Sequence, residues 1–278
     1  MIARSRTKPV TRPGVSHPSG SSGPPSAAAV PRVVRRVRDD WAQLCAATPH
    51  PALFDPSLVV ELPEPVRRYL THVIAAGTPL WQSVQVSMVG QIKLGAWRPF
   101  TATQVVAPSR GYIWAANARL FGVPVIGYDR LSAGTAQMRW RLLDLVPVMT
   151  ADGPDVARSA AGRLASEIAM IPTAFPGATW TADGPDTAVA TWGAGEEQQR
   201  VQLHLGPTGQ LLDLLIQRWG NPDGKPFSRY PFGVTVDQER TDAGVTTPAA
   251  VRAGWWRGTE HQDAGEFFRA QITTVTFR

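Results

Sequence analysis

The chain has 278 residues, and 43% of them are hydrophobic, which supports a substantial buried core and excludes a chain that is disordered throughout. The formal net charge of +6 comes from one end, because residues 1–38 hold eight basic and no acidic residues. Residues 39–278 therefore carry a net charge of −2, which argues against a nucleic-acid-binding domain. The only cysteine, Cys45, excludes an intramolecular disulfide and a cysteine-based metal cluster, and it fits a cytoplasmic location.

The N-terminal residues are predicted to form a disordered basic tail. Residues 1–31 are rich in Pro, Gly, Ser and Thr and contain few large apolar side chains. An arginine-rich run, Arg32–Arg38, completes this tail, so we expect two parts: a tail over 1–38 and a single β-rich domain over 39–278. No long apolar run follows the basic start, so a secretory signal is not expected. The tail predicts, at most, weak contact with an anionic membrane surface and no specific nucleic-acid binding.

Two helices are predicted at the start of the domain. Asp39 and Asp40 supply capping oxygens for a short helix over 41–47. A clearer helix begins near Pro63 and ends at Gly77, with apolar residues at helical spacing on one face. These are Val66, Tyr69, Leu70, Val73 and Ile74.

From residue 82 the apolar period changes to two, which is typical of strands. Closely spaced strands with turn signals between them are predicted over 84–92, 100–107, 111–118, 123–131 and 135–143. A helix over 156–171 interrupts them, beginning after Gly153-Pro154 and ending before Pro172. Strands resume over 188–192, 201–205, 211–219, 233–241, 250–258 and 266–277. This order predicts an α+β fold that is mainly antiparallel β, a curved sheet or half-barrel with the mid-chain helix on its concave face.

Motifs of known chemistry are missing from the sequence. There is no G-x-S-x-G nucleophile elbow, no H-E-x-x-H pair and no phosphate-binding glycine loop. The five histidines are scattered, and His204 falls on the polar side of its strand. We therefore predict no catalytic residue, no metal site and no cofactor.

Aromatic and methionine side chains on the predicted strands are the candidates for a ligand cavity. Ten tryptophans is a high number for this length, and apolar residues on the inner face of a curved sheet line either a packed core or a cavity. The cavity candidates are Met88, Phe100, Trp114, Met138 and Trp140, with Arg163 and Glu167 on the covering helix. The last two are spaced i, i+4, which equally predicts an ordinary ion pair on a helix face.

Several segments together resemble an uncharacterised bacterial domain-of-unknown-function family. They are Leu62-Pro-Glu-Pro-Val-Arg-Arg-Tyr-Leu70, Trp97-Arg-Pro-Phe-Thr-Ala-Thr-Gln104, Gly111-Tyr-Ile-Trp114, Arg163-Leu-Ala-Ser-Glu167, Pro172-Thr-Ala-Phe175 and Trp180. The resemblance covers residues 60–278 and implies a fold similar to the LolA/LolB-type lipoprotein carriers, an antiparallel half-barrel with helices on its concave side. It implies no established activity, and the chain lacks the lipobox cysteine of a lipoprotein.

Three functional hypotheses remain open at this point. The first is a non-enzymatic binder of a hydrophobic small molecule, a lipid or an acyl chain, inside the half-barrel. The second is an enzyme that uses Glu167 or Asp129 as a base and Arg139 or Arg163 to hold an anionic substrate. The third is a structural or interaction protein without a small ligand. The oligomeric state is left open.

Overall fold

The strands of the protein form one continuous antiparallel sheet. The computed structural model describes residues 31–193 and 197–278, and within them thirteen strands pair in the order β6-β5-β4-β3-β2-β1-β13-β12-β11-β10-β9-β8-β7. Their bounds are Val84–Leu94 (β1), Ala96–Ala107 (β2), Gly111–Leu120 (β3), Val123–Ser132 (β4), Thr135–Leu142 (β5), Val146–Asp152 (β6), Thr179–Ala182 (β7), Thr187–Trp192 (β8), Gln199–Leu205 (β9), Leu211–Gly220 (β10), Ser228–Asp242 (β11), Val245–Trp255 (β12) and Glu266–Phe277 (β13). The predicted class, an α+β protein built on an antiparallel curved sheet, is confirmed.

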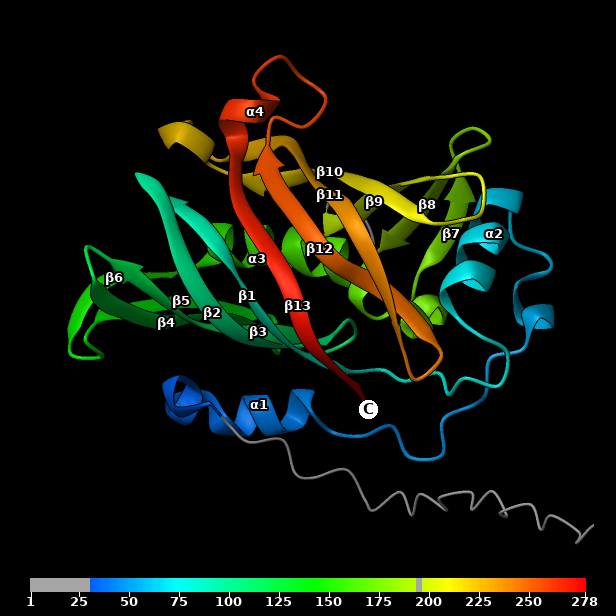
Figure 1. Ribbon diagram of the computed structural model, residues 1–278, viewed down its shortest axis with the longest axis horizontal. Coiled ribbons are helices and arrows are strands. Elements are labelled where there is room, and N and C mark those ends of the chain that lie inside the picture. Colours follow the sequence, from blue (N-terminus) through cyan, green and yellow to red (C-terminus); the bar gives the residue numbers. More distant parts are fainter. Residues whose placement is uncertain (1–30, 194–196) are drawn as a thin grey trace, which may run out of the picture.

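The strand order divides the sheet into two meanders. Strands β1 to β6 form one and β7 to β13 the other, and each strand pairs with its neighbours along the chain. The exception is the central pair, in which β1 runs antiparallel to β13 from Val84↔Phe277 to Ile92↔Phe268. Figure 1 shows the two meanders meeting along this pair and curving away from it. The pairing of the first and last strands therefore joins the two meanders into one curved sheet.

Helix α3 (Pro154–Ser166) covers the concave face. It connects the two edge strands, β6 and β7, and contacts β10 and β9 of one meander and β4, β5 and β6 of the other. In Figure 1 it lies behind β12 and β13, inside the curve of the sheet. The predicted helix was longer, but the α-helix ends at Ser166, whose Oγ donates to the carbonyl of Arg163 at 2.7 Å. A 3₁₀ turn, η3 (Glu167–Met170), continues it.

The N-terminal helices cover the opposite, convex face of the first meander. The 3₁₀ helix η1 (Arg32–Val37) and helix α1 (Arg38–Leu44) bury Val34 and Trp41 against outward residues of β2, β3 and β4. The predicted tail boundary is therefore wrong for residues 32–38, because apolar side chains between the arginines give this run a packing face. The rest of the predicted tail, residues 1–30, lies outside the described residues. Asp40 pairs with Arg130 and accepts from Ser132 instead of capping the helix.

Helix α2 (Glu64–Val73) packs on β7, β8 and β12, as its predicted apolar face requires. The remaining helices are short. They are η2 (Pro56–Val59), η4 (Pro172–Gly177), η6 (Pro222–Gly224) and α4 (Gln262–Gly265). Among the described residues, no helix has the length and apolar content needed to cross a membrane.

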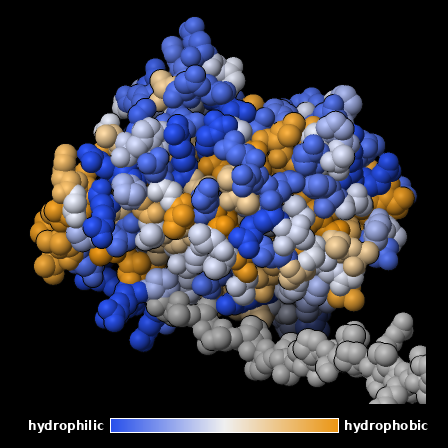
Figure 2. Space-filling model, in the orientation of Figure 1, coloured by the Kyte–Doolittle hydropathy of each residue, from blue (hydrophilic) through white to orange (hydrophobic). Residues whose placement is uncertain are grey.

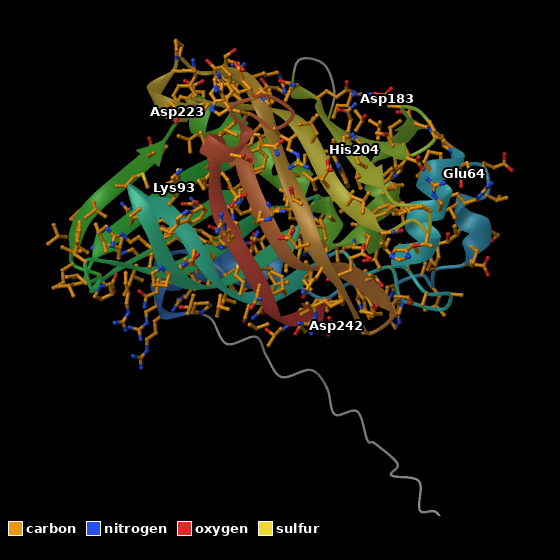
Figure 3. The ribbon with its side chains drawn as sticks, turned by 45° about the horizontal axis from the view of Figure 1, so that its top comes forward. Glu64, Lys93, Asp183, His204, Asp223 and Asp242 are labelled. Carbon is orange, nitrogen blue, oxygen red and sulfur yellow. The ribbon has the colours of Figure 1, made fainter. Side chains whose placement is uncertain are left out.

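The outer surface combines polar sheet faces with exposed apolar regions, one of which lies at the end formed by β3 to β6 (Figure 2). Figure 3 shows polar side chains extending outward, among them His204, whose Nδ1 lies 2.7 Å from Asp213 Oδ1. The β3–β4 turn and the β5–β6 hairpin expose large apolar side chains, which Figure 2 shows as an orange region at the left edge. They are Phe121, Leu143, Leu145, Val146, Val148 and Met149.

Candidate functional site

A cavity of about 370 Å³ lies between the concave face and the α3–η3 segment. One wall is a row of residues that pair across β1 to β5, so their side chains share one face of the sheet. This row is Val86, Gln104, Trp114, Asp129 and Met138, and all five line the cavity. The strand register of the first meander thus places two polar side chains in an otherwise apolar wall.

The second meander supplies a wall that is apolar except for Arg218. Strands β10 to β13 contribute side chains that alternate inward along each strand. They are Leu214, Arg218, Phe232, Val234, Val236, Pro248, Val251, Ala253, Trp255, Phe267, Phe268, Ala270 and Ile272. The volume lies in the lower part of the range typical of small-molecule pockets, roughly 300–1,000 Å³.

Five of the seven predicted cavity residues line this space: Met88, Trp114, Met138, Arg163 and Glu167. The other two lie on the same face of the sheet, beside the lining. Phe100 packs edge-on against Trp114 with ring centroids 5.6 Å apart, and Trp140 packs against Trp114 at 5.5 Å. Phe100 and Trp140 therefore support the lining instead of forming it. Contact of these residues with a ligand stays a prediction.

Arg163 is the centre of a buried polar network. Its Nε donates to Glu167 Oε1 at 2.9 Å and its Nη1 to Asp129 Oδ2 at 3.2 Å. The second oxygen of each carboxylate also has a donor, because Trp140 Nε1 lies 2.9 Å from Asp129 Oδ1 and Gln104 Nε2 lies 2.6 Å from Glu167 Oε2. The predicted helix-face ion pair is thus turned inward, and it is part of a network in which each carboxylate oxygen accepts a hydrogen bond.

Burial shifts the proton equilibria of this network. It raises the pKa of Asp129 above its usual value, although Arg163 and Trp140 oppose the shift. Burial alone would lower the pKa of Arg163, but Glu167, Tyr112 and Asp129 outweigh it and raise that pKa above its usual value. Arg163 is therefore a permanent cation that fixes two carboxylates beside the cavity.

Arg218 is a second cation on the cavity wall, and it was not among the predicted residues. It follows Leu214 and Ile216 at alternate positions of β10, so it points to the same inner face. Nε donates to the Ser159 carbonyl at 3.1 Å and Nη2 to Ser159 Oγ at 3.4 Å. The guanidinium also lies over the rings of Phe232 and Trp255, at 4.8 and 5.2 Å from their centroids. An arginine in register with two buried aliphatic residues was the signal that could have identified it.

The groups of the enzyme hypothesis converge only in part. Asp129, Arg163 and Glu167 meet at the cavity. Arg139 lies opposite Tyr128 in the register of β4 and β5, and because the Tyr128 ring lies in the convex-face core, the Arg139 side chain points away from the cavity. Within the described ranges, no three His, Cys, Asp or Glu side chains gather as a metal site would require. The polar wall is thus a hydrogen-bonded network without a grouped set of metal ligands among those residues.

Comparisons with known proteins identify a family and similar solved structures. A model described as a family of unknown function, DUF6544, matches residues 52–267, so the expected domain-of-unknown-function family is confirmed. No curated protein matches the chain. Solved structures also match the chain, among them the following two. One is an outer membrane lipoprotein-sorting protein domain from Vibrio parahaemolyticus, at 11% identity and a TM-score of 0.39, with coverage of 71% of this chain and 86% of that one. The other is a LolA superfamily protein from Nitrosomonas europaea, at 8% identity and a TM-score of 0.42, with coverage of 77% and 92%.

Proposed function

We propose that this chain, which belongs to the DUF6544 family, is a non-enzymatic binder of a hydrophobic ligand, a lipid or an acyl chain, held in the cavity. The observation that carries the proposal is the cavity itself. Its walls are mostly aliphatic and aromatic, and protein interiors are otherwise packed as densely as organic crystals. An apolar space of about 370 Å³ leaves its lining without dispersion contacts that an apolar ligand would supply.

The polar wall is consistent with binding. Each oxygen of Asp129 and Glu167 already accepts a hydrogen bond, and both carboxylates are tied to Arg163. The network therefore supports a structural role for these carboxylates, namely fixing η3 against β2 and β4.

Two substitutions on neighbouring residues of β13 test the proposal. Ala270 is buried and lines the cavity, whereas Gln271 is exposed and points to the opposite face. In Ala270→Phe a phenyl ring occupies part of the cavity, so we expect the amount of co-purifying lipid to fall by about tenfold or more. In Gln271→Phe the same ring is added outside, so the amount should not change.

The measurement is native mass spectrometry of the purified protein, with lipid extraction and quantification of the bound fraction. Thermal unfolding of both variants verifies that they fold. If no apolar molecule co-purifies with the parent chain and none binds when added, the proposal fails. Equal loss of ligand in both variants would also contradict it, because only one of the rings enters the cavity.

A further inference from the structure

Arg218 differs from Arg163 in what surrounds its charge. Arg163 contacts two carboxylates, whereas Arg218 has no carboxylate within 4.0 Å among the described residues. Its hydrogen-bond partners are the carbonyl and the hydroxyl of Ser159, both neutral. Two of its five N–H donors are used, and the remaining three have no acceptor in the described part of the chain. The cation therefore lies on the cavity wall without an anion to pair with it.

An unpaired arginine on an apolar wall is costly unless something compensates it. Charged groups that leave water lose solvation, and pairing in good geometry is what offsets this loss. The rings of Phe232 and Trp255 offset part of it through cation–π contacts. Burial still lowers the pKa of Arg218 to about 10, so the side chain stays charged at neutral pH. What is missing is an anion.

The carboxylates of the cavity do not supply this anion. Asp129 and Glu167 are instead bound by Arg163, Trp140 and Gln104, each through its own hydrogen bond. They contribute to the potential at Arg218 but make no contact with it. The site is therefore polarised: a compensated cluster lies at Arg163, and a free positive charge lies at Arg218 among apolar residues.

We infer that the ligand is an anionic amphiphile, a single hydrocarbon chain whose carboxylate or phosphate head group pairs with Arg218 while the chain fills the apolar cavity. The inference rests on the proposed function and specifies its ligand class. The planar guanidinium fork matches both kinds of oxyanion, and Ser159 Oγ beside it is a further hydrogen-bonding group. The aromatic rings that flank Arg218 contact the first carbons of the chain.

Three probes with the same chain length separate the head group from the chain: dodecanoate, dodecyl phosphate and dodecanol. Their affinities for the full chain are measured by titration calorimetry, with tryptophan fluorescence as a second readout because Trp114 and Trp255 line the cavity. We expect at least one anionic probe to bind roughly ten- to a hundred-fold more tightly than dodecanol, as a hydrogen-bonded charge pair would give. The ranking of the two anions identifies the source of the head group.

Three variants assign the preference to Arg218. Arg218→Met keeps the length of the side chain and removes its charge, so the anionic probes should bind no better than dodecanol. Arg218→Lys keeps the charge and should retain part of the preference. Arg200→Met removes an exposed arginine from the neighbouring strand β9 and should leave all three affinities unchanged. Binding of dodecanol to Arg218→Met, within about twofold of the parent chain, verifies that the variant cavity is folded.

The outcomes separate the two proposals. If dodecanol binds the parent chain as tightly as both anions, or if Arg218→Met keeps the preference, the inference is wrong and the apolar binder remains. If none of the three probes binds, the proposed function fails as well. A preference that disappears only in Arg218→Met supports both.

Discussion

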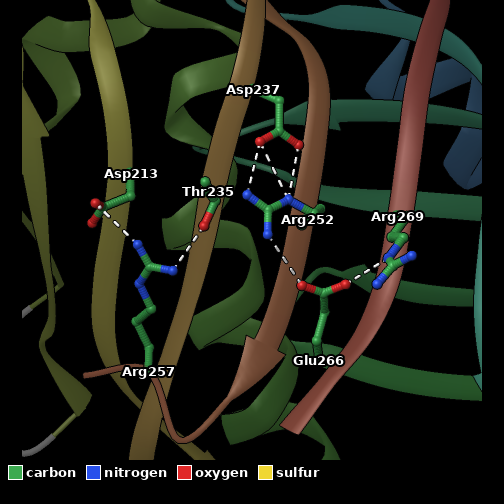
Figure 4. Close-up of polar contacts among 7 residues, drawn as sticks. All are labelled: Asp213, Thr235, Asp237, Arg252, Arg257, Glu266 and Arg269. Carbon is green, nitrogen blue, oxygen red and sulfur yellow. Dashed lines mark hydrogen bonds and ion pairs between the residues drawn. The ribbon is translucent and has the colours of Figure 1, made fainter. Parts of the chain in front are cut away.

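The concave and convex faces of the sheet carry the same kinds of ion pair in different surroundings. On the concave face Arg163, Asp129 and Glu167 expose 20%, 13% and 15% of their side chains, and all three border an apolar cavity. On the convex face a chain of pairs crosses β11, β12 and β13: Arg252 lies 2.9 Å from Asp237 and 3.4 Å from Glu266. Figure 4 shows this chain, with Arg269 on the other oxygen of Glu266 and a separate pair of Arg257 and Asp213.

The exposure of each ion pair determines how much it contributes to the stability of the fold. Arg252 exposes 42% and Asp237 39% of the side chain, so water and salt screen their attraction, and either group is well solvated when alone. A group of the concave network has little water to replace a lost partner. Ion pairs of similar length on the two faces are therefore expected to contribute differently to the free energy of unfolding. Substitutions on each face measure this difference.

The largest effect is expected from Arg163→Met. It leaves Asp129 and Glu167 buried without their common cation, and breaking a buried pair from one side costs about 3–5 kcal/mol. The measurement is the free energy of unfolding from urea denaturation, and Arg252→Met on the convex face is the matched control. A loss for Arg163→Met no larger than that of the control would show that the concave pairs are as well solvated as the convex ones.

A smaller effect is expected from Asp129→Asn, about 1–3 kcal/mol, because asparagine keeps an acceptor for Trp140 or Arg163 but not for both. Its size should depend on pH. The pKa of Asp129 is raised in the folded protein, so its ionisation removes stability as the pH rises from 3.8 through the raised pKa. The substitution should therefore cost more at about pH 4 than at about pH 7. A cost that grows toward neutral pH would contradict this sign.

The smallest effect, below about 1 kcal/mol, is expected from Asp237→Asn. Its pH dependence should have the opposite sign. Hydrogen bonds from Arg252 lower the pKa of Asp237, so its contribution is present above the usual value of 3.8 and is lost as the pH falls through the lowered pKa. We expect the cost of this variant to shrink toward acid pH and in high salt, measured by the same urea denaturation. A cost that is unchanged in high salt would show that the pair is not screened.

Much of the fold could be predicted from local patterns. Alternating apolar residues identified most strands, and the stripe on 156–171 identified the covering helix. Strand β6 was missed because its apolar side chains are exposed and Pro147 interrupts it. Strand β7, Thr179–Ala182, has only four residues, too few for a period. The run 32–38 was misassigned because its charge obscured the apolar residues that pack on the sheet.

The site could be predicted only in part, because pairing between strands brings some of its residues together. Met88, Trp114 and Met138 follow from alternation within single strands, and Arg163 and Glu167 from helical spacing. The row that joins Gln104 to Asp129 depends on register between strands, which no single-strand pattern specifies. Arg218 is visible in the alternation of β10, but its lack of an anionic partner depends on what other strands bring near it.

The pairing of β1 with β13 has a consequence for how the chain is made. The centre of the sheet joins its first strand to its last, so a nascent chain can build both meanders locally but cannot join them before β13 has emerged from the ribosome. Contacts between residues so distant in sequence form slowly, because the loop that they close is long. Until then Val86 of β1 and Ile272 of β13, which line the cavity from adjacent strands, remain exposed to water. The cavity is therefore the last part of the molecule to be enclosed during synthesis, and a ligand present at that moment could be enclosed with it.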